Sequence, residues 1–265
     1  MKKYLVIGNP IEHSLSPALH NYWIQKNNIN AIYEKQKIEG NEIKNLVLQL
    51  REKKINGFNI TVPFKKEIIS YLDELSKEAK ETQSVNTVYL NKDKIVGHNT
   101  DIEGFELSLK DSGFDIKNKK ILILGAGGVV PSIIFTLVKM KASQIILSNR
   151  SREKAENLKK LFNDLKIINW GEIIDFDIII NATSVGLKKN DKLDLNFPKI
   201  GKDKFFYDVI YNPNETDFLR QGKKLNNKTQ NGEKMFVYQA LAAFKIWHGV
   251  QPTIDDKVLE IFNND

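Results

Sequence analysis

The chain has 265 residues, of which 41% are hydrophobic, and its 40 Lys and Arg outnumber its 33 Asp and Glu, giving a net charge of +7. This composition suits one large or two moderate globular domains and excludes a disordered or fibrous chain. Without cysteine, disulfides, thiolate chemistry and cysteine-ligated metal sites are excluded, and no apolar run reaches the roughly 20 residues that span a bilayer. We expect a cytoplasmic protein with no membrane partner.

The positive charge does not indicate a nucleic-acid partner. Lysines are spread along the chain among acidic residues, and the densest tract, 223–234, contains no aromatic residue. These lysines are best interpreted as a solvated surface, and we expect no nucleic acid. A modest positive excess also suits an anionic small substrate and a phosphate-bearing cofactor.

Apolar runs alternate with amphipathic stretches along nearly the whole chain, which is typical of an α/β fold. In the first part of the chain, the pattern predicts strands at Tyr4–Ile7, Ile32–Lys37, Gly57–Thr61, Thr87–Leu90 and Ile95–Gly97. It predicts helices at Ala18–Lys26, Glu42–Lys53, Lys65–Leu72 and Ile102–Ser112. The last helix ends before Gly113, a common stop signal, and the pattern changes near residue 102, where we place a domain boundary.

A second series of strands and helices starts at Lys120. Its strands are predicted at 121–125, 144–149, 177–181 and 205–210, with helices to about Lys141, from Arg152 and near Glu215–Gly222. A long helix, Glu233–Trp247, and a short helix from Thr253 complete the chain. The whole pattern predicts an α/β fold with two domains.

A glycine-rich loop follows the first strand of this second series. In LILGAGGVVPS, Gly125, Gly127 and Gly128 lie between a strand and a helix, as in dinucleotide-binding folds. Such glycines let the backbone approach a pyrophosphate, whose charge is met by N–H groups at the helix start. The third glycine of the usual pattern is replaced by Val130, and Pro131 falls in the first helical turn, where its missing N–H costs little. We expect this loop to bind a dinucleotide rather than to be a plain turn.

The end of the next strand indicates which dinucleotide. Folds that prefer NAD usually carry Asp or Glu there, to bind the ribose hydroxyls. This chain has Asn149, Arg150 and Ser151, with Lys154 one turn later. The guanidinium of an arginine can grip a phosphate and a serine can donate a hydrogen bond to it, so the sequence favours NADP over NAD.

A nicotinamide cofactor implies hydride transfer, which needs a group that exchanges the alcohol proton. None of the four histidines has metal-ligand spacing with another, so we expect no metal, and His20 and His248 are interpreted as structural or surface residues. Polar residues gather instead at predicted strand ends in the first part of the chain, where side chains of an open α/β sheet can converge on one cleft. They are Ser14, Ser16, Asn59, Thr61, Lys65, Asn86 and Asp101.

Nine short motifs, in order, carry a resemblance to a known family. They are HSLSP, NITVPFK, SVNT, GHNTD, GAGG, NRS, NATSVG, FYDVIY.P and NGEKMFVYQA, and they run from residue 13 to about 241. Together they resemble shikimate dehydrogenases. The resemblance implies reversible NADPH-dependent reduction of 3-dehydroshikimate to shikimate, in aromatic amino-acid and chorismate biosynthesis. It also implies a substrate-binding catalytic domain (1–101), a Rossmann-type NADP-binding domain (102–232, with 102–112 as the connecting helix) and C-terminal helices (233–265) that pack on the substrate domain.

The resemblance also assigns roles to particular residues. Lys65 and Asp101 are the implied catalytic pair. The substrate, shikimate or 3-dehydroshikimate, is then held by Ser14, Ser16, Thr61, Asn86, Gln239 and Tyr211, together with the catalytic pair. NADP(H) is held by Gly125, Ala126, Gly127, Gly128, Val129, Asn149, Arg150, Ser151, Lys154, Thr183, Val209 and Gly232. We expect a monomer or a homodimer.

Two other functions are compatible with the sequence. A quinate/shikimate dehydrogenase that uses NAD has the same fold and the same catalytic pair, but the strand end at Arg150 argues against it. A non-catalytic NADP-binding sensor could retain the fold, but the presence of both Lys65 and Asp101 argues against that reading.

Overall fold

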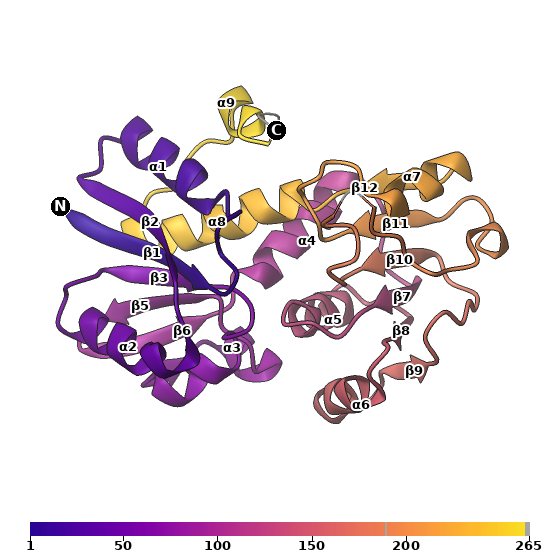
Figure 1. Cartoon of the computed structure of the whole chain (residues 1–265), viewed down its shortest axis with the longest axis horizontal. Helices are drawn as coiled ribbons and strands as arrows, with labels where there is room; N and C mark the ends of the chain where they lie inside the picture. The colour runs from indigo at the N-terminus through magenta and orange to yellow at the C-terminus, as the bar shows by residue number, and fades with distance from the viewer. Residues whose placement is uncertain (189, 263–265) are drawn as a thin grey trace. The chain divides into compact units, whose positions relative to one another are not determined.

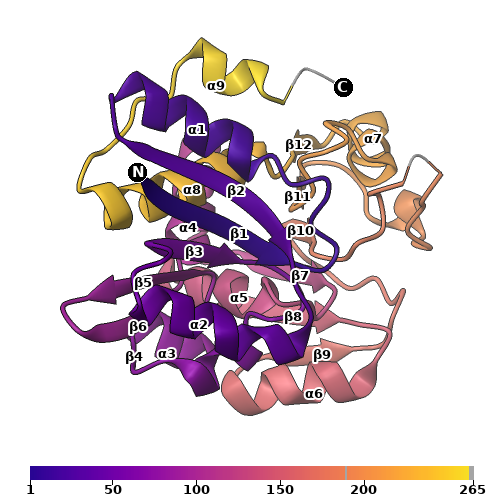
Figure 2. The ribbon, with the colours of Figure 1, turned by 60° about the vertical axis from the view of Figure 1, so that its left-hand side comes forward.

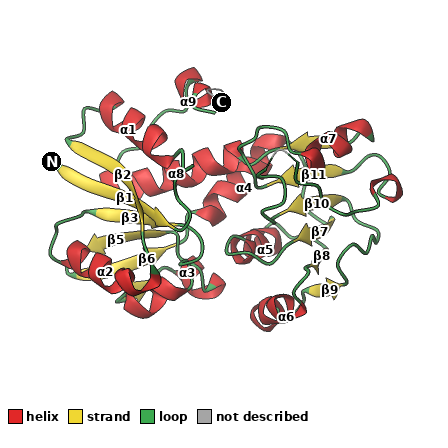
Figure 3. Cartoon of the chain, viewed as in Figure 1, coloured by secondary structure: helices red, strands yellow, loops and turns green. Residues whose placement is uncertain are grey.

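The computed structural model describes residues 1–188 and 190–262, and the chain divides into two compact units. Unit 1 comprises Met1–Gly104 and Val237–Asp265, and unit 2 comprises Phe105–Phe236. Each unit is built around a six-stranded sheet (Figures 1 and 3). No helix within 1–188 or 190–262 is both long and apolar enough to cross a membrane.

The sheet of unit 1 is mixed, with the strand order β2-β1-β3-β5-β6-β4. Its strands are β1 (Lys2–Gly8), β2 (Ala31–Lys37), β3 (Gly57–Ile60), β4 (Glu74–Leu75), β5 (Thr87–Asn91) and β6 (Lys94–His98). β1 pairs in parallel with β2 and β3, whereas β5 runs antiparallel to both β3 and β6. The end of β3, the start of β5 and the end of β6 therefore lie side by side at one end of these strands, where Asn59 pairs with Thr87 and Thr87 with His98.

Helices cover both faces of this sheet (Figures 1 and 2). The helical elements are α1 (Ser16–Lys26), η1 (Gly40–Glu42), α2 (Ile43–Arg51), η2 (Glu67–Tyr71) and α3 (Lys77–Thr82). In α2, the buried residues Ile43, Leu46, Val47 and Leu50 recur at helical spacing and pack in one core cluster with Leu5 and Ile7 of β1. Tyr4 alternates with them and points to the opposite face, where its ring contacts Trp247.

The sheet of unit 2 is entirely parallel, with the order β12-β11-β10-β7-β8-β9. Its strands are β7 (Lys120–Leu124), β8 (Gln144–Ser148), β9 (Lys166–Ile168), β10 (Ile178–Asn181), β11 (Phe205–Asp208) and β12 (Lys228–Gln230). Numbered from β7, this is the order 3-2-1-4-5-6 of dinucleotide-binding folds. Ile121 and Ile123 belong to one core and Leu122 and Leu124 to another, so β7 is buried on both faces.

The remaining helices are α4 (Asp101–Ser112), α5 (Val130–Lys139), α6 (Arg152–Leu161), η3 (Phe197–Lys199), α7 (Asp217–Lys224), α8 (Glu233–His248) and α9 (Asp256–Glu260). The unit boundaries fall inside α4 and α8, so both helices contribute residues to each unit. These data confirm the predicted α/β class, with a mixed sheet in the N-terminal part and a parallel dinucleotide-binding sheet after it.

One predicted helix is wrong, and several short elements were not predicted. The segment Lys65–Leu72 forms only the 3₁₀ helix η2, because Asp73 already pairs with Ile95 of the sheet and leaves no room for further α-helical turns. The short elements β4, α3, β9 and β12 lack an apolar run long enough to give a pattern. The other predicted helix ends differ by a few residues from those in the structure.

Candidate active site

Lys65 and Asp101 form a close, largely buried ion pair in unit 1. The Nζ atom of Lys65 lies 2.5 Å from Oδ2 of Asp101, and the two side chains are only 12% and 8% exposed. Lys65 lies in the turn after β3, and its carbonyl accepts a hydrogen bond from the Val85 N–H at 2.8 Å. Asp101 is the first residue of α4, where the helix dipole favours a negative charge. The neighbouring Lys66, in contrast, is exposed.

Asn86 holds the second oxygen of this carboxylate. Its Nδ2 donates to Asp101 Oδ1 at 2.8 Å and to Thr100 Oγ1 at 2.9 Å, while its Oδ1 accepts from the Thr100 N–H at 2.8 Å. The backbone N–H of Asp101 donates to Asn99 Oδ1 at 3.1 Å. Both oxygens of Asp101 thus have fixed partners, and the carboxylate can orient the Lys65 ammonium.

A second layer of polar residues lies behind Asn86. The Nδ2 of Asn59 donates to the carbonyl of Asn86 at 3.0 Å and to Thr87 Oγ1 at 2.9 Å, and its Oδ1 accepts from the Tyr33 hydroxyl at 2.6 Å. Asn59 and Asn86 are 7% and 3% exposed. Buried polar groups that are all hydrogen-bonded in this way hold one geometry.

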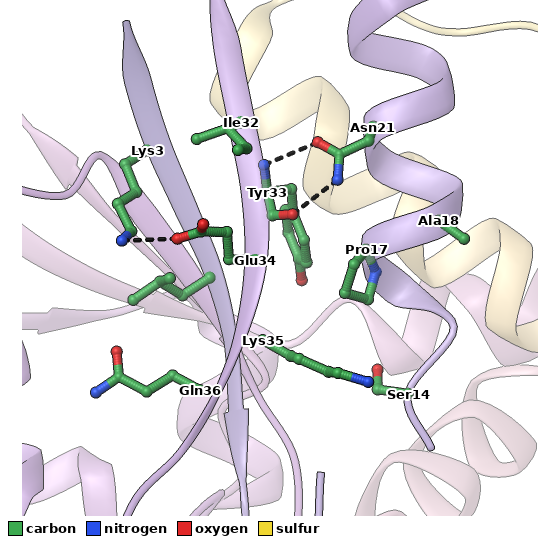
Figure 4. A pocket seen from close by; sticks show the side chains of 11 residues that line it. Lys3, Ser14, Pro17, Ala18, Asn21, Ile32, Tyr33, Glu34, Lys35 and Gln36 are labelled. Atoms are coloured by element: carbon green, nitrogen blue, oxygen red, sulfur yellow. Dashed lines mark hydrogen bonds and ion pairs between the residues drawn. The ribbon is translucent and has the colours of Figure 1, made fainter. Parts of the chain in front are cut away.

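The serines and the threonine of the predicted substrate set lie on loops and a helix start of the same unit. Ser14 is half-buried, and its Oγ accepts from the N–H of Ser16, the first residue of α1. Ser14 also lines a surface pocket between α1 and the edge strand β2 (Figure 4). Thr61 is half-buried directly after β3, and its N–H donates to the Ile7 carbonyl at 2.9 Å.

Three members of the predicted substrate set lie close together in unit 1. Lys65, Asn86 and Asp101 form one hydrogen-bonded cluster. Gln239 lies half-buried on the part of α8 that belongs to unit 1. Tyr211 lies in unit 2, with its ring centroid 4.4 Å from that of Phe236.

The glycine loop of unit 2 has the backbone geometry that a dinucleotide requires. Gly125 has φ +105°, and a Cβ there would lie 2.8 Å from the Ala182 carbonyl oxygen, so only glycine fits. Gly127 is exposed, and a Cβ there would come no nearer than 3.7 Å to its closest neighbour. Backbone N–H groups around Gly127 can therefore be approached closely at the start of α5. Val130, which replaces the third glycine, is fully buried in the core of unit 2.

Two cationic side chains follow β8, at the same end of the parallel sheet as the glycine loop. Arg150 and Lys154 are exposed, and Ser151 caps α6 by accepting from the Lys154 N–H at 3.4 Å. Asn149 donates to the Ser151 carbonyl at 2.8 Å, which fixes the turn between them. This donor set, with two cations and no carboxylate at the strand end, fits a phosphate on the cofactor's adenosine ribose.

A buried carboxylate that the sequence analysis did not single out organises the ends of β10 and β11. Asp208 accepts hydrogen bonds from Thr216 Oγ1 at 2.7 Å, from the Ile210 N–H at 3.0 Å and from Asn181 Nδ2 at 3.1 Å. Burial raises the pKa of Asp208 to about 6. Asn181 Oδ1 in turn accepts from the hydroxyl of Thr183 at 2.7 Å.

The turn after β11 also approaches Gly232 closely. A Cβ at Gly232 would lie 2.1 Å from the Val209 carbonyl oxygen, and the Gly232 N–H donates to the Ile210 carbonyl at 2.9 Å. The three predicted cofactor residues therefore lie in connected turns. Thr183 is linked through Asn181 to Asp208 at the end of β11, and Gly232 packs against Val209, the residue after Asp208. Among the described residues, no three His, Asp or Glu side chains are grouped so that they could hold a metal ion.

Two family models match this chain. The model described as "Shikimate dehydrogenase substrate binding domain" matches residues 6–88, and "Shikimate / quinate 5-dehydrogenase" matches residues 106–208. The first match includes β2, β3 and β4 of unit 1, and the second includes the glycine loop and β7 to β11 of unit 2.

Full-length relatives agree with these matches. A shikimate dehydrogenase (NADP(+)) of Pelagibacter ubique is 58% identical over 262 residues, which cover 99% of each chain. The crystal structure of the Aquifex aeolicus shikimate dehydrogenase has a TM-score of 0.91 at 40% identity and covers 100% of this chain and 98% of its own. The Thermus thermophilus enzyme, solved with NADP(H) and shikimate, has a TM-score of 0.89 at 30% identity and covers 99% of each chain. The chain therefore belongs to the NADP-dependent shikimate dehydrogenase family.

Proposed function

We propose that this shikimate dehydrogenase interconverts 3-dehydroshikimate and shikimate through a proton exchange at Lys65 and Asp101. Unit 1 then serves as the substrate domain and unit 2 as the NADP domain. The observation that carries the proposal is the 2.5 Å contact between Lys65 Nζ and Asp101 Oδ2, with both side chains largely buried. A largely buried ammonium beside an oriented carboxylate is suited to exchanging a proton with the reacting oxygen of an alcohol.

The substrate is a carboxylate that carries several hydroxyl groups, and the polar residues of unit 1 match it. Serine and threonine hydroxyls can donate to a carboxylate or pair with a hydroxyl. We assign substrate binding to the residues that the resemblance implies, which are Ser14, Ser16, Thr61, Asn86, Tyr211 and Gln239 besides the catalytic pair. The hydrogen bonds that fix Asn86 and Ser14 support this assignment, because a pre-oriented group loses less entropy when it binds.

The chemistry that NADP supplies when bound is the acceptance or return of a hydride. The residues of unit 2 fit it. The loop from Gly125 to Val129 would hold the pyrophosphate, because its exposed backbone lies at a helix start. Asn149, Arg150, Ser151 and Lys154 would hold the 2′-phosphate, and Thr183, Val209 and Gly232 would hold the nicotinamide end. One chain carries both sets of residues, so we expect it to work as a monomer or a homodimer.

Oxidation of shikimate, followed by the absorbance of NADPH, tests this function. We expect turnover with shikimate and NADP, and much weaker turnover when NAD replaces NADP or quinate replaces shikimate. Equal turnover of quinate with NAD would indicate a quinate/shikimate dehydrogenase. No turnover of shikimate with either cofactor would support a non-catalytic NADP-binding protein.

A further inference from the structure

Asn181 and Asp208 are the last residues of two neighbouring strands of unit 2, β10 and β11. They are partners in the parallel pairing of these strands, so their side chains point to the same face of the sheet. Both residues are 0% exposed. Asn181 Nδ2 lies 3.1 Å from each carboxylate oxygen of Asp208 and donates to them. The ends of the two strands are therefore joined by a buried hydrogen-bonded pair as well as by the backbone of the sheet.

Asn181 fixes the turn that follows β10. Its Oδ1 accepts from the Thr183 N–H at 3.1 Å and from the Thr183 hydroxyl at 2.7 Å. Its Nδ2, besides bonding to Asp208, donates to the Val185 carbonyl at 3.1 Å. The Asn181 amide therefore ties this turn to the end of β10 and, through Asp208, to the end of β11.

Asp208 fixes the turn that follows β11 and the start of α7. Its Oδ1 accepts from the Ile210 N–H at 3.0 Å, and its Oδ2 accepts from the Thr216 hydroxyl at 2.7 Å. Thr216 is the N-cap residue of α7. A carboxylate has two oxygens that can each accept more than one hydrogen bond, so this one side chain holds three segments of the chain. An amide has a single acceptor oxygen and cannot accept from all three donors.

The turn after β10 also packs directly against the residues that Asp208 holds. Gly186 has φ +118°, and a Cβ there would lie 3.0 Å from the γ-methyl group of Thr216 and 3.2 Å from Cδ1 of Ile210. The hydrogen bonds of Asp208 and this close packing therefore join the same two turns. A change at Asp208 is expected to move the two turns relative to each other.

We propose that Asp208 is a positioning residue for the nicotinamide end of NADP, one that fixes Thr183 relative to Val209. This inference rests on the proposed function, because it takes Thr183 and Val209 as contacts of the nicotinamide end. Thr183 is linked to Asp208 through Asn181, and Val209 follows Asp208 directly in the chain. In an open α/β sheet, ligands bind beyond the carboxyl ends of the strands, where both turns lie. Asp208 does not contact the cofactor in this account and acts only through the two turns.

The test compares the wild type with Asp208→Asn, Asn181→Ala and the double variant. Asp177→Asn is the matched control, because Asp177 lies just before β10, at the opposite end of the sheet, where it accepts from the Lys120 N–H at 2.8 Å. Burial already disfavours the charge of Asp208 and raises its pKa to about 6, so the neutral amide should be tolerated and Asp208→Asn should fold. Calorimetry measures the Kd of NADPH and the Kd of adenosine 2′,5′-bisphosphate, a fragment that keeps adenine and the 2′-phosphate but has no nicotinamide.

We expect Asp208→Asn to raise the Kd of NADPH about tenfold and that of the bisphosphate less than about twofold, because only NADPH reaches the nicotinamide end. Asn181→Ala should give a similar pair of values. In the Asn181→Ala background, the change at Asp208 should raise the Kd of NADPH less than about threefold, because the link is already broken. Asp177→Asn should match the wild type for both ligands.

The inference is overturned by an unchanged Kd of NADPH in Asp208→Asn, by an equal rise for both ligands, or by full multiplication of the single effects in the double variant. An effect of Asp177→Asn as large as that of Asp208→Asn would overturn it as well. If Asp208→Asn does not fold, the two Kd values of Asn181→Ala decide, and equal rises or no rise count against the inference. A wild type that binds NADPH without oxidising shikimate contradicts only the proposed function, whereas one that does not bind NADPH contradicts both.

Discussion

The Lys65 ammonium and the Asp101 carboxylate meet at 2.5 Å although 36 residues separate them in the chain. The contact arises because the turn after β3 and the start of α4, which follows β6, lie at the same end of the strands of the unit 1 sheet. Asn86, directly before the antiparallel strand β5, lies at the same place and holds the other carboxylate oxygen at 2.8 Å. The pair is therefore fixed by the sheet and not by local sequence.

Asp101→Asn tests whether the negative charge of Asp101 is needed, because the variant keeps the size of the side chain and removes only its charge. The amide keeps the size of the side chain and can still bond to Asn86, but it cannot balance the Lys65 ammonium. We expect kcat to fall about 100-fold, in the range that general acid–base groups contribute, with a smaller change in the KM of shikimate. Steady-state kinetics with circular dichroism as a folding control measures this. A kcat within about twofold of the wild type would remove Asp101 from the catalytic pair.

Arg150→Ala should act on the choice of cofactor. An exposed guanidinium at the end of β8 can bind a 2′-phosphate that NADP has and NAD lacks, so the KM of NADP should rise about tenfold or more while that of NAD stays nearly constant. Arg152→Ala is the matched control, because Arg152 is also exposed and already pairs with Glu156 at 2.8 Å. Equal effects of Arg150→Ala on both cofactors would contradict the assignment.

Asp208 should make stability depend on pH. Its pKa is raised from 3.8 to about 6 in the folded protein, chiefly by burial. Its favourable contribution is therefore complete below about pH 4 and is lost as the pH rises through about 6, a change on the order of 3 kcal/mol. Asp208→Asn cannot ionise, so its free energy of unfolding relative to the wild type should increase over this pH range. Urea denaturation at several pH values measures it, and parallel pH profiles for the two proteins would refute the prediction.

Gly232→Ala should be destabilising for a steric reason. The new methyl group would lie 2.1 Å from the Val209 carbonyl oxygen, so the backbone must move, at a cost of about 1–3 kcal/mol. Gly127→Ala, whose methyl group would have 3.7 Å to its nearest neighbour, should leave stability nearly unchanged while raising the KM of NADP. Thermal unfolding of both variants tests this contrast. It fails if Gly232→Ala is as stable as the wild type.

Much of the fold follows from local patterns in the sequence. Apolar runs such as Ile121–Leu124 show a parallel strand, and the glycines after it show where the chain turns. The sequence also predicts that Lys65, Asn86 and Asp101 lie close together. All three stand where a predicted strand begins or ends, and such positions can converge on one cleft in an open α/β sheet. Periodicity fails where elements are too short, as in η2, whose length is limited by the pairing of Asp73 with Ile95.

The second layer of the site could not be predicted in the same way. Tyr33 looks like an ordinary apolar residue of an alternating strand, and the bond from its hydroxyl to Asn59 exists only once β2 and β3 have paired with β1. Asp208 stands at a strand end, which is a usable signal, but its burial and its bond to Asn181 depend on the pairing of β10 with β11. Contacts of this kind depend on tertiary packing, which leaves no periodic trace in the sequence.

The comparison of Lys65→Ala with Lys66→Ala tests the central claim most directly. The two lysines are neighbours in sequence, but Lys65 is bound to Asp101 and Lys66 is exposed. The measurement is kcat for shikimate oxidation with NADP, together with the KM of shikimate. The account predicts that Lys65→Ala loses at least about 100-fold in kcat with a much smaller change in KM, and that Lys66→Ala retains full activity. Full activity in Lys65→Ala, or an equal loss in both variants, would contradict it.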